Sequence, residues 1–199
     1  CVTLFPYTTL FRSGRQHTLV IVSTDTGTLY VAATPIGNLS DISDRFRQVL
    51  SSVSAVACED SRVTGRLLQH LGLKVRMIPC RQQVQGRCAG QILSLLQQGE
   101  SVALVTDAGT PAISDPGAAV VAKVHHQGLA VSPIPGASAL ATALSVSGWS
   151  VPALFVGFLS PRAGRRKRAL ETYLAHPYQL VILESPHRIA ALAGELARL

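Results

Sequence analysis

Charged residues and long apolar runs are both scarce in this chain. Charged residues make up 15% of its 199 positions, whereas apolar residues make up 47%. That balance excludes a disordered chain and is typical of well-buried α/β structure. The apolar residues are also dispersed, and no run approaches the roughly 18 residues that a membrane helix needs. The sequence therefore predicts a folded protein with no membrane segment.

Cysteine is scarce too, and its spacing excludes the usual zinc sites. The four cysteines are Cys1, Cys58, Cys80 and Cys88, with no C-x-x-C pair among them and no secretory signal ahead of them. Other common site motifs are missing as well, since there is no G-x-G-x-x-G, G-x-x-x-x-G-K-[ST], G-x-S-x-G or H-E-x-x-H. We therefore expect a reduced cytoplasmic protein that holds no metal.

Positive charge is present in excess and is concentrated in one place. The formal charge is +7 and the isoelectric point is near 9.8, which indicates an anionic partner such as nucleic acid or a polycarboxylate. Five basic residues fall within seven positions: Arg162, Arg165, Arg166, Lys167 and Arg168. No acidic residue follows them before Glu171, so the run is costly unless an anion neutralises it. The alternative is a solvated start of a helix.

The two ends of the sequence do not resemble natural protein ends. It begins with Cys1, and Thr3–Ser13 matches the translation of a common sequencing-adaptor oligonucleotide. We expect residues 1–26 to be an artefactual or flexible segment outside the fold. At the other end a helical pattern stops at Leu199 without a C-cap glycine or a following proline, so we expect the last domain to be incomplete.

From residue 28 onward, short β-branched runs alternate with amphipathic segments of helical length. Expected strands lie at 29–33, 55–58, 75–78, 102–106 and 130–134. Expected helices lie at 42–53, 62–71, 86–98, 116–127 and 138–147, and several end at a glycine. This alternation predicts an α/β fold over residues 27–148, with a mostly parallel sheet and helices on both faces.

After Gly148 the same pattern starts again. Expected strands lie at 154–158 and 179–183, and expected helices at 165–175 and 187–199. A segment of about 50 residues cannot bury a sheet core alone. Residues 149–199 are therefore predicted to begin a second α/β domain whose remainder is missing.

Three loops that follow expected strands are rich in glycine and proline. They lie at 34–38, 106–117 and 133–139. Parallel sheets bind ligands beyond the carboxyl ends of their strands, and small residues let a ligand approach the backbone. The three loops together therefore predict one ligand site. The alternative is that each is only a tight turn between strands.

Two further segments place carboxylates beside an arginine. In Cys58–Arg62, Glu59 or Asp60 can orient or deprotonate a substrate hydroxyl while Arg62 holds a phosphate. In the alternative, Asp60 caps the following helix and Arg62 lies in its first turn. Glu184–Arg188 has the same character in the second domain.

With these loops in view, the chain resembles the tetrapyrrole methylase superfamily, and within it the ribosomal RNA small subunit methyltransferase I family. The resemblance covers residues 27–199. It is carried by TPIGNLSDIS (34–43), CEDSR (58–62), TGRLLQHLG (64–72), VTDAGTPAISDPG (105–117), PIPGASA (133–139), VGFLSP (156–161), GRRKRAL (164–170) and LESPHR (183–188). The first, fourth and last motifs together distinguish this family from the precorrin-modifying branch.

The resemblance implies a two-domain tetrapyrrole-methylase fold and transfer of a methyl group from S-adenosylmethionine to the 2′-hydroxyl of a cytidine in 16S ribosomal RNA. It also implies a homodimer, with the cofactor bound in the cleft between the two domains of each subunit. The cofactor residues that it implies are Pro35, Ile36, Gly37, Asp107, Ala108, Gly109, Thr110, Pro111, Ile113, Ser138, Ala139 and Glu184. Glu59, Asp60 and Arg62 are the candidate catalytic residues, and the basic run at 162–168 then neutralises RNA phosphates.

One stretch departs from the family pattern. Where the family usually has a segment containing His, Asn and Glu, this chain has Arg81–Gln85, so no role of that segment can be transferred. Two alternative functions remain at this point. One is a porphyrinoid C-methyltransferase, whose carboxylate-rich substrate would also favour basic residues, and the other is a non-catalytic relative that binds RNA.

Overall fold

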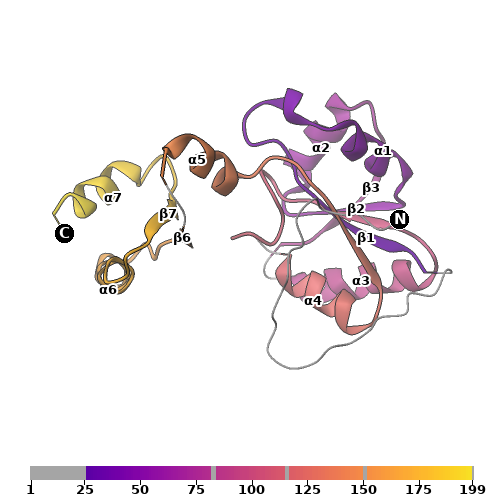
Figure 1. The fold of residues 1–199 in the computed structure, drawn as a ribbon. Coiled ribbons are helices and arrows are strands. Elements are labelled where there is room, and N and C mark those ends of the chain that lie inside the picture. Colours follow the sequence, from indigo (N-terminus) through magenta and orange to yellow (C-terminus); the bar gives the residue numbers. More distant parts are fainter. Residues whose placement is uncertain (1–25, 82–83, 115–116, 150–151, 199) are drawn as a thin grey trace.

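The protein was analysed as a computed structural model that describes residues 26–81, 84–114, 117–149 and 152–198. These residues form a five-stranded sheet and a separate two-stranded sheet, each with its own helices (Figure 1). Residues 1–25 of the expected N-terminal segment lie outside the described residues. Among the described residues, no helix is long and apolar enough to span a membrane.

The larger sheet is entirely parallel, as its apolar strands require. Its strands are β1 (Thr28–Ala32), β2 (Ala55–Cys58), β3 (Arg76–Pro79), β4 (Val102–Leu104) and β5 (Ala130–Ile134). They lie in the order β3-β2-β4-β1-β5, and every neighbouring pair is parallel. The two central strands β2 and β4 are buried at every position, as expected where helices cover both faces.

Four helices cover the two faces of this sheet (Figure 1). On one face, α1 (Asp44–Ser52) and α2 (Ser61–His70) pack Phe46, Leu50 and Leu68 against the strands. On the other face, α3 (Gln85–Gln97) and α4 (Ala118–His126) pack their own apolar side chains. A short 3-10 helix, η1 (Leu39–Asp41), precedes α1. The two apolar clusters confirm the predicted arrangement of a covered parallel sheet.

Most predicted helix ends agree with the structure to within one or two residues, and capping residues set several of them. The helix expected at 187–199 is found at Ile189–Leu196. The helix expected at 42–53 begins at Asp44, since the Ser43 side chain accepts a hydrogen bond from the Phe46 amide and so caps the first turn. The helices that precede Gly72 and Gly148 end there, and both glycines have a φ in the left-handed region, +69° and +68°. The residue expected to start the fourth helix, Pro116, lies outside the described residues.

The second unit begins after α5 (Ala139–Ser147), which lies between the two sheets (Figure 1). It contains β6 (Ala153–Phe158), α6 (Ala163–Leu174), β7 (Gln179–Leu183) and α7 (Ile189–Leu196). β6 and β7 form a parallel pair, and three leucines make up its buried cluster: Leu159, Leu170 and Leu192. The second unit thus buries far fewer side chains than the large sheet does.

Candidate functional site

A cavity of about 350 Å³ lies at the carboxyl edge of the large sheet, where the second unit faces it. Ligand cavities of small molecules are commonly about 300–1,000 Å³. Eight of the twelve residues expected to bind the cofactor line it: Ile36, Asp107, Ala108, Gly109, Thr110, Ile113, Ser138 and Ala139. The three glycine- and proline-rich loops therefore converge on one cavity.

Hydrogen bonds join these loops to one another. Thr34 and Gly109 form an isolated antiparallel bridge in which each backbone amide donates to the other residue's carbonyl, at 2.9 and 3.1 Å. The buried Thr34 hydroxyl also donates to the Thr106 carbonyl at 3.1 Å. On the far side, the Thr110 hydroxyl donates to the Ala137 carbonyl at 3.1 Å. The loops after β1, β4 and β5 thus hold one another in place around the cavity.

The loop after β4 has an unusual backbone. Gly109 has a φ of +90°, and a β-carbon there would lie 3.4 Å from the Ile36 side chain. Ala112 and Ser114 have φ values of +69° and +63°, although neither is a glycine. Non-glycine residues in this region cost about 1–2 kcal/mol each and concentrate at functional sites. This strain is consistent with a loop shaped for a ligand.

Aromatic and aliphatic side chains of the second unit line the opposite wall. Phe155 and Phe158 of β6 and Leu183 of β7 face the cavity. β6 comes close because Gly157 has no side chain: a β-carbon there would lie 2.6 Å from the Ser114 hydroxyl oxygen. These three residues were not predicted from the sequence. Phe158 is 56% exposed at the carboxyl end of β6. An aromatic residue at the carboxyl end of an expected strand could have indicated a ligand contact.

Two carboxylates line the cavity, each just beyond the end of one of two neighbouring strands. Glu59 follows β2 and Asp107 follows β4, and both line the cavity. The Thr106 hydroxyl donates to Glu59 Oε2 at 3.3 Å, and the Asp60 amide donates to Asp107 Oδ1 at 3.0 Å. These contacts fix the positions of both carboxylates at the cavity.

Asp60 and Arg62, expected as catalytic residues, are engaged elsewhere. Asp60 caps α2 by accepting from the Arg62 amide at 2.9 Å, and the Arg62 guanidinium pairs with the same carboxylate at 2.6 Å. The hydrogen bonds from Arg62 hold the pKa of Asp60 well below its usual range. The structure thus has the capping arrangement left open by the sequence, and of the three expected catalytic residues Glu59 lines the cavity.

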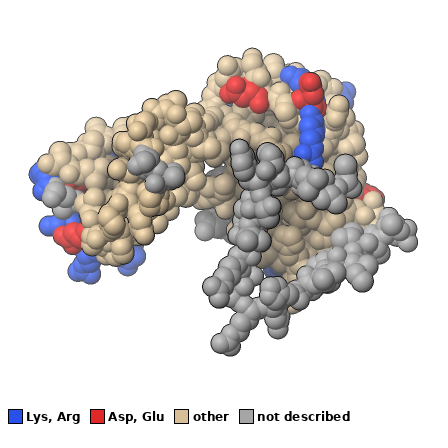
Figure 2. Space-filling view, in the orientation of Figure 1, with Lys and Arg blue, Asp and Glu red and all other residues tan. Residues whose placement is uncertain are grey.

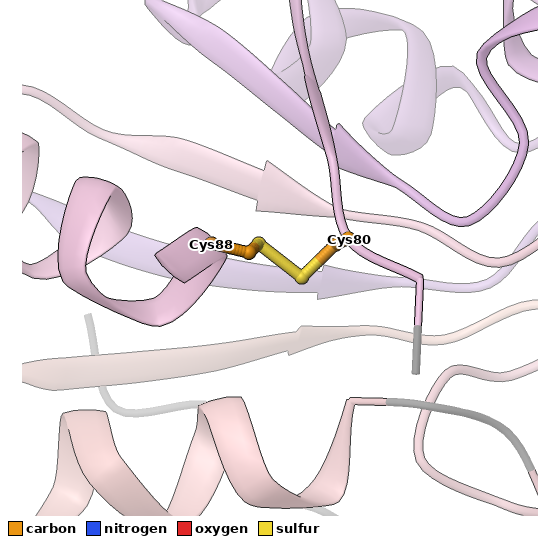
Figure 3. The surroundings of a disulfide bond; sticks show 2 residues. All are labelled: Cys80 and Cys88. Carbon is orange, nitrogen blue, oxygen red and sulfur yellow. A yellow bond between two sulfur atoms is a disulfide. The ribbon is translucent and has the colours of Figure 1, made fainter. Parts of the chain in front are cut away.

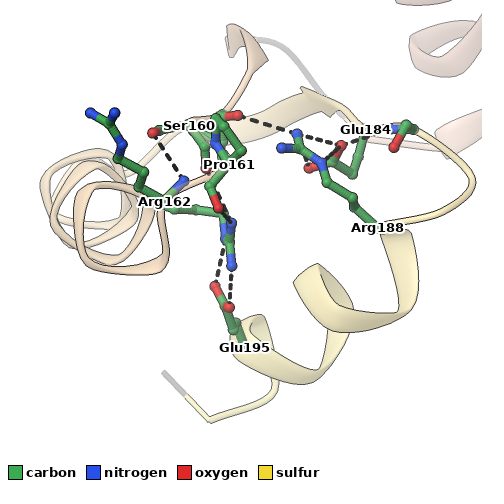
Figure 4. Close-up of polar contacts among 9 residues, drawn as sticks. Ser160, Pro161, Arg162, Glu184, Arg188 and Glu195 are labelled. Atoms are coloured by element: carbon green, nitrogen blue, oxygen red, sulfur yellow. Dashed lines mark hydrogen bonds and ion pairs between the residues drawn. The ribbon is translucent and has the colours of Figure 1, made fainter.

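Four residues expected at the cofactor do not line this cavity. Pro35 lines a neighbouring one, whereas Gly37 and Pro111 lie in the loops but outside the lining. The Glu184 side chain is only 1% exposed and binds the Arg188 guanidinium (Figure 4). Burial opposes its ionisation, but hydrogen bonds from the Ser185 amide and from Arg188 outweigh burial and lower its pKa. Glu184 therefore orders the end of β7, which corrects the assignment to the cofactor.

The basic run at 162–168 is not uniform. Arg166 is 9% exposed and binds Glu195 of α7, with its Nε 2.8 Å from Glu195 Oε2. Its Nη1 donates to the carbonyls of Ser160 and Pro161 (Figure 4). The expectation that Arg166 contacts RNA is therefore wrong, because Glu195 and two carbonyls already occupy its guanidinium. No local pattern around Arg166 indicates this partner, which lies 29 positions away.

The other four cations of the run are exposed: Arg162, Arg165, Lys167 and Arg168. Figure 2 shows basic side chains gathered at the outer end of the second unit. Lys167 lies 3.9 Å from Glu171 within α6, a pair that is exposed on both sides. The first turn of α6 has no acidic residue and no side-chain cap. Cations near the positive end of a helix are electrostatically unfavourable, and a bound anion would reduce that repulsion.

Two of the cysteines depart from the expected reduced state. Cys80 and Cys88 form a disulfide between the end of β3 and the first turn of α3, with their Cα atoms 5.4 Å apart (Figure 3). The prediction of reduced thiols is wrong for this pair, because spacing along the chain does not show that two elements meet. Cys58 is free and buried, and its burial raises the thiol pKa. The described residues contain no cluster of His, Cys, Asp and Glu suited to a metal.

Comparison with known proteins agrees with this fold. The family model of the tetrapyrrole (corrin/porphyrin) methylases matches residues 28–199. The solved structure of uroporphyrin III C-methyltransferase from Thermus thermophilus has a TM-score of 0.60 and 21% identity, over 87% of this chain and 77% of that one. Diphthine synthase has a TM-score of 0.62 and 16% identity, over 86% and 72%. At such low identities these two structures establish the shared fold alone.

Curated relatives are more similar in sequence. Proteins named ribosomal RNA small subunit methyltransferase I are 45% identical in Pseudomonas aeruginosa and 41% in Neisseria meningitidis serogroup B, over 82% and 87% of this chain. One from Coprothermobacter proteolyticus is 42% identical over 86% of this chain and 78% of its own length. The chain therefore belongs to the tetrapyrrole methylases and, within them, to the ribosomal RNA small subunit methyltransferase I family. It spans 58% and 60% of the first two relatives.

Proposed function

We propose that the full-length protein transfers a methyl group from S-adenosylmethionine to the 2′-hydroxyl of a cytidine in 16S ribosomal RNA. The observation that carries this proposal is the cavity between the three joined loops and the aromatic wall of β6. The family and the names of the curated relatives support a ribosomal RNA substrate.

The residues around the cavity fit S-adenosylmethionine. Gly109 keeps one side open because a β-carbon there would approach Ile36. The mostly apolar lining, with Phe155 and Phe158 opposite the loops, suits an adenine ring. Asp107 and Ser138 are polar groups available to the ribose or to the amino-acid end. When bound, the cofactor supplies a methyl group carried on a positively charged sulfur.

Glu59 is the candidate for the proton that the acceptor hydroxyl loses. Its carboxylate lines the cavity and accepts a hydrogen bond from the Thr106 hydroxyl, so its position is fixed before the substrate binds. Methyl transfer to an alcohol depends mainly on positioning, and a weak base is sufficient. We assign Glu59 to orient the hydroxyl and accept its proton at a carboxylate oxygen.

The four exposed cations at the start of α6 are proposed to hold RNA phosphates. They carry sequence-independent charge contacts, which set affinity and orientation rather than the choice of nucleotide. Arg166 supports this surface indirectly, since its ion pair with Glu195 joins the start of α6 to α7.

We also propose that two copies of the chain associate. α5 has no charged residue and no buried residue, and Val146 near its end is 80% exposed. Trp149, just beyond the helix, is 53% exposed. An apolar helix of this kind is typical of a surface covered by another chain. We place the protein in the cytoplasm with the ribosome.

The test is methyl transfer by the full-length protein with labelled S-adenosylmethionine. The proposal predicts label in 16S ribosomal RNA of small subunits, resistant to alkali at one cytidine because its 2′-hydroxyl is blocked. A Glu59→Gln variant should lower kcat while leaving cofactor affinity unchanged. Label on a porphyrinoid substrate instead of RNA would refute the proposal. RNA binding without any methyl transfer would indicate a non-catalytic relative.

A further inference from the structure

A second cavity, of about 210 Å³, lies at the same edge of the large sheet, against α2. Thr106 and Asp107 line both cavities. Of two consecutive residues in the loop after β1, Pro35 lines the second cavity and Ile36 lines the first. The loops after β1 and β4 therefore contribute to both cavities, which adjoin at Thr106 and Asp107.

Hydrogen bonds join the two loops that the cavities share. Thr34 and Gly109 form a backbone bridge between them, and the Thr34 hydroxyl donates to the Thr106 carbonyl. The carboxylate of Asp107 accepts from the Asp60 amide, and this hydrogen bond connects the loop after β4 to the start of α2. Ligands in the two adjoining cavities would approach each other at Thr106 and Asp107.

The second cavity has the chemistry of a nucleotide site. Pro35 and, from α2, Val63 and Leu67 give it apolar sides that suit the faces of a base. Asp107 offers a carboxylate to a sugar hydroxyl. Arg66 lies at the edge with an exposed side chain. No carboxylate among the described residues is within ion-pair distance of it, so its charge is available to a phosphate.

We propose that this second cavity binds the acceptor ribonucleotide, with its base between Pro35, Val63 and Leu67 and its phosphate on Arg66. The inference rests on the proposed function, since it assigns the place of the RNA substrate. In-line methyl transfer requires the reacting atoms to be about 3–3.5 Å apart, so acceptor and cofactor sites must share a boundary. Thr106 and Asp107 form such a boundary, beside Glu59.

The experiment compares Arg66→Gln and Val63→Phe with wild type in the full-length protein. Arg66→Gln removes the phosphate contact, and Val63→Phe fills the cavity. The control is Arg76→Gln, an exposed arginine at the first residue of β3, on the opposite edge of the sheet. Each variant is measured for affinity to a 16S ribosomal RNA fragment, for KM with small subunits, and for S-adenosylmethionine affinity.

Arg66→Gln should raise the RNA dissociation constant and KM by about tenfold, as expected for one lost charge-assisted contact. Val63→Phe should raise both as well, because its ring occupies the space proposed for the base. Cofactor affinity should stay within twofold of wild type, and Arg76→Gln should behave as wild type. Unchanged RNA affinity in Arg66→Gln, a surface change that does not threaten folding, would overturn the inference. The RNA-binding measurement decides the inference even if wild type transfers no methyl group, an outcome that would count against the proposed function alone.

Discussion

The exposed basic surface at the start of α6 gives a quantitative prediction. Changing Arg165, Lys167 and Arg168 to Gln removes three positive charges and leaves the ion pair of Arg166 with Glu195 intact. If each side chain contacts one phosphate, the salt dependence of RNA binding should become shallower by about 0.7 to 0.9 log units per contact. For three contacts, the affinity ratio of wild type to variant should shrink by about 15- to 40-fold between 50 and 200 mM salt.

The assay is RNA binding by the full-length protein across a salt series. A matched control changes Lys74, Arg76 and Lys123 to Gln, which alters net charge equally on exposed sites of the first unit. The α6 variant should also be no less stable than wild type, because it removes cations from the positive end of a helix. Parallel salt dependences for wild type and the α6 variant would refute the reasoning, since the charges would then face only solvent.

Two further predictions concern stability. Because Arg166 lowers the pKa of Glu195, the ion pair should stabilise the protein fully above about pH 4.5 and progressively less as pH falls through the lowered pKa. Glu195→Gln should abolish that part of the pH dependence, and identical acid unfolding profiles would argue against it. The bond between Cys80 and Cys88 closes a short loop, so reductant should lower the free energy of unfolding by about 2.5 kcal/mol. A Cys80→Ser/Cys88→Ser variant should not respond to reductant, and urea unfolding measures both effects.

Most of the fold could be predicted from the sequence because its signals are local. β-branched runs, capping residues and terminal glycines act within a few positions, and Ser43 and Gly72 show how closely they set helix ends. The convergence of the three loops also followed, since the carboxyl ends of parallel strands share one edge of the sheet.

What could not be predicted depends on contacts between distant residues. Arg166 looked like its neighbours in sequence, but Glu195 of α7 binds it. Cys80 and Cys88 showed no recognised spacing, yet β3 and α3 bring them together. Phe155 entered the cavity wall only because Gly157 lets β6 approach the loop after β4. In each case the partner is supplied by packing rather than by a motif.

The most direct test of the account is S-adenosylmethionine binding by a Gly109→Val variant of the full-length protein. Valine at this left-handed position should cost about 1–2 kcal/mol of stability through the backbone. It should also place side-chain atoms against Ile36 and narrow the cavity. The matched control is Gly72→Val, which has the same backbone cost at φ +69° with open space around it.

Both variants should be measured by thermal unfolding and by calorimetric titration with the cofactor. We expect similar losses of thermal stability in the two variants. The dissociation constant should rise at least tenfold, a loss of about 1.4 kcal/mol of binding energy, in Gly109→Val alone. Wild-type affinity in Gly109→Val would contradict the central claim that S-adenosylmethionine binds in the cavity between the three loops and β6.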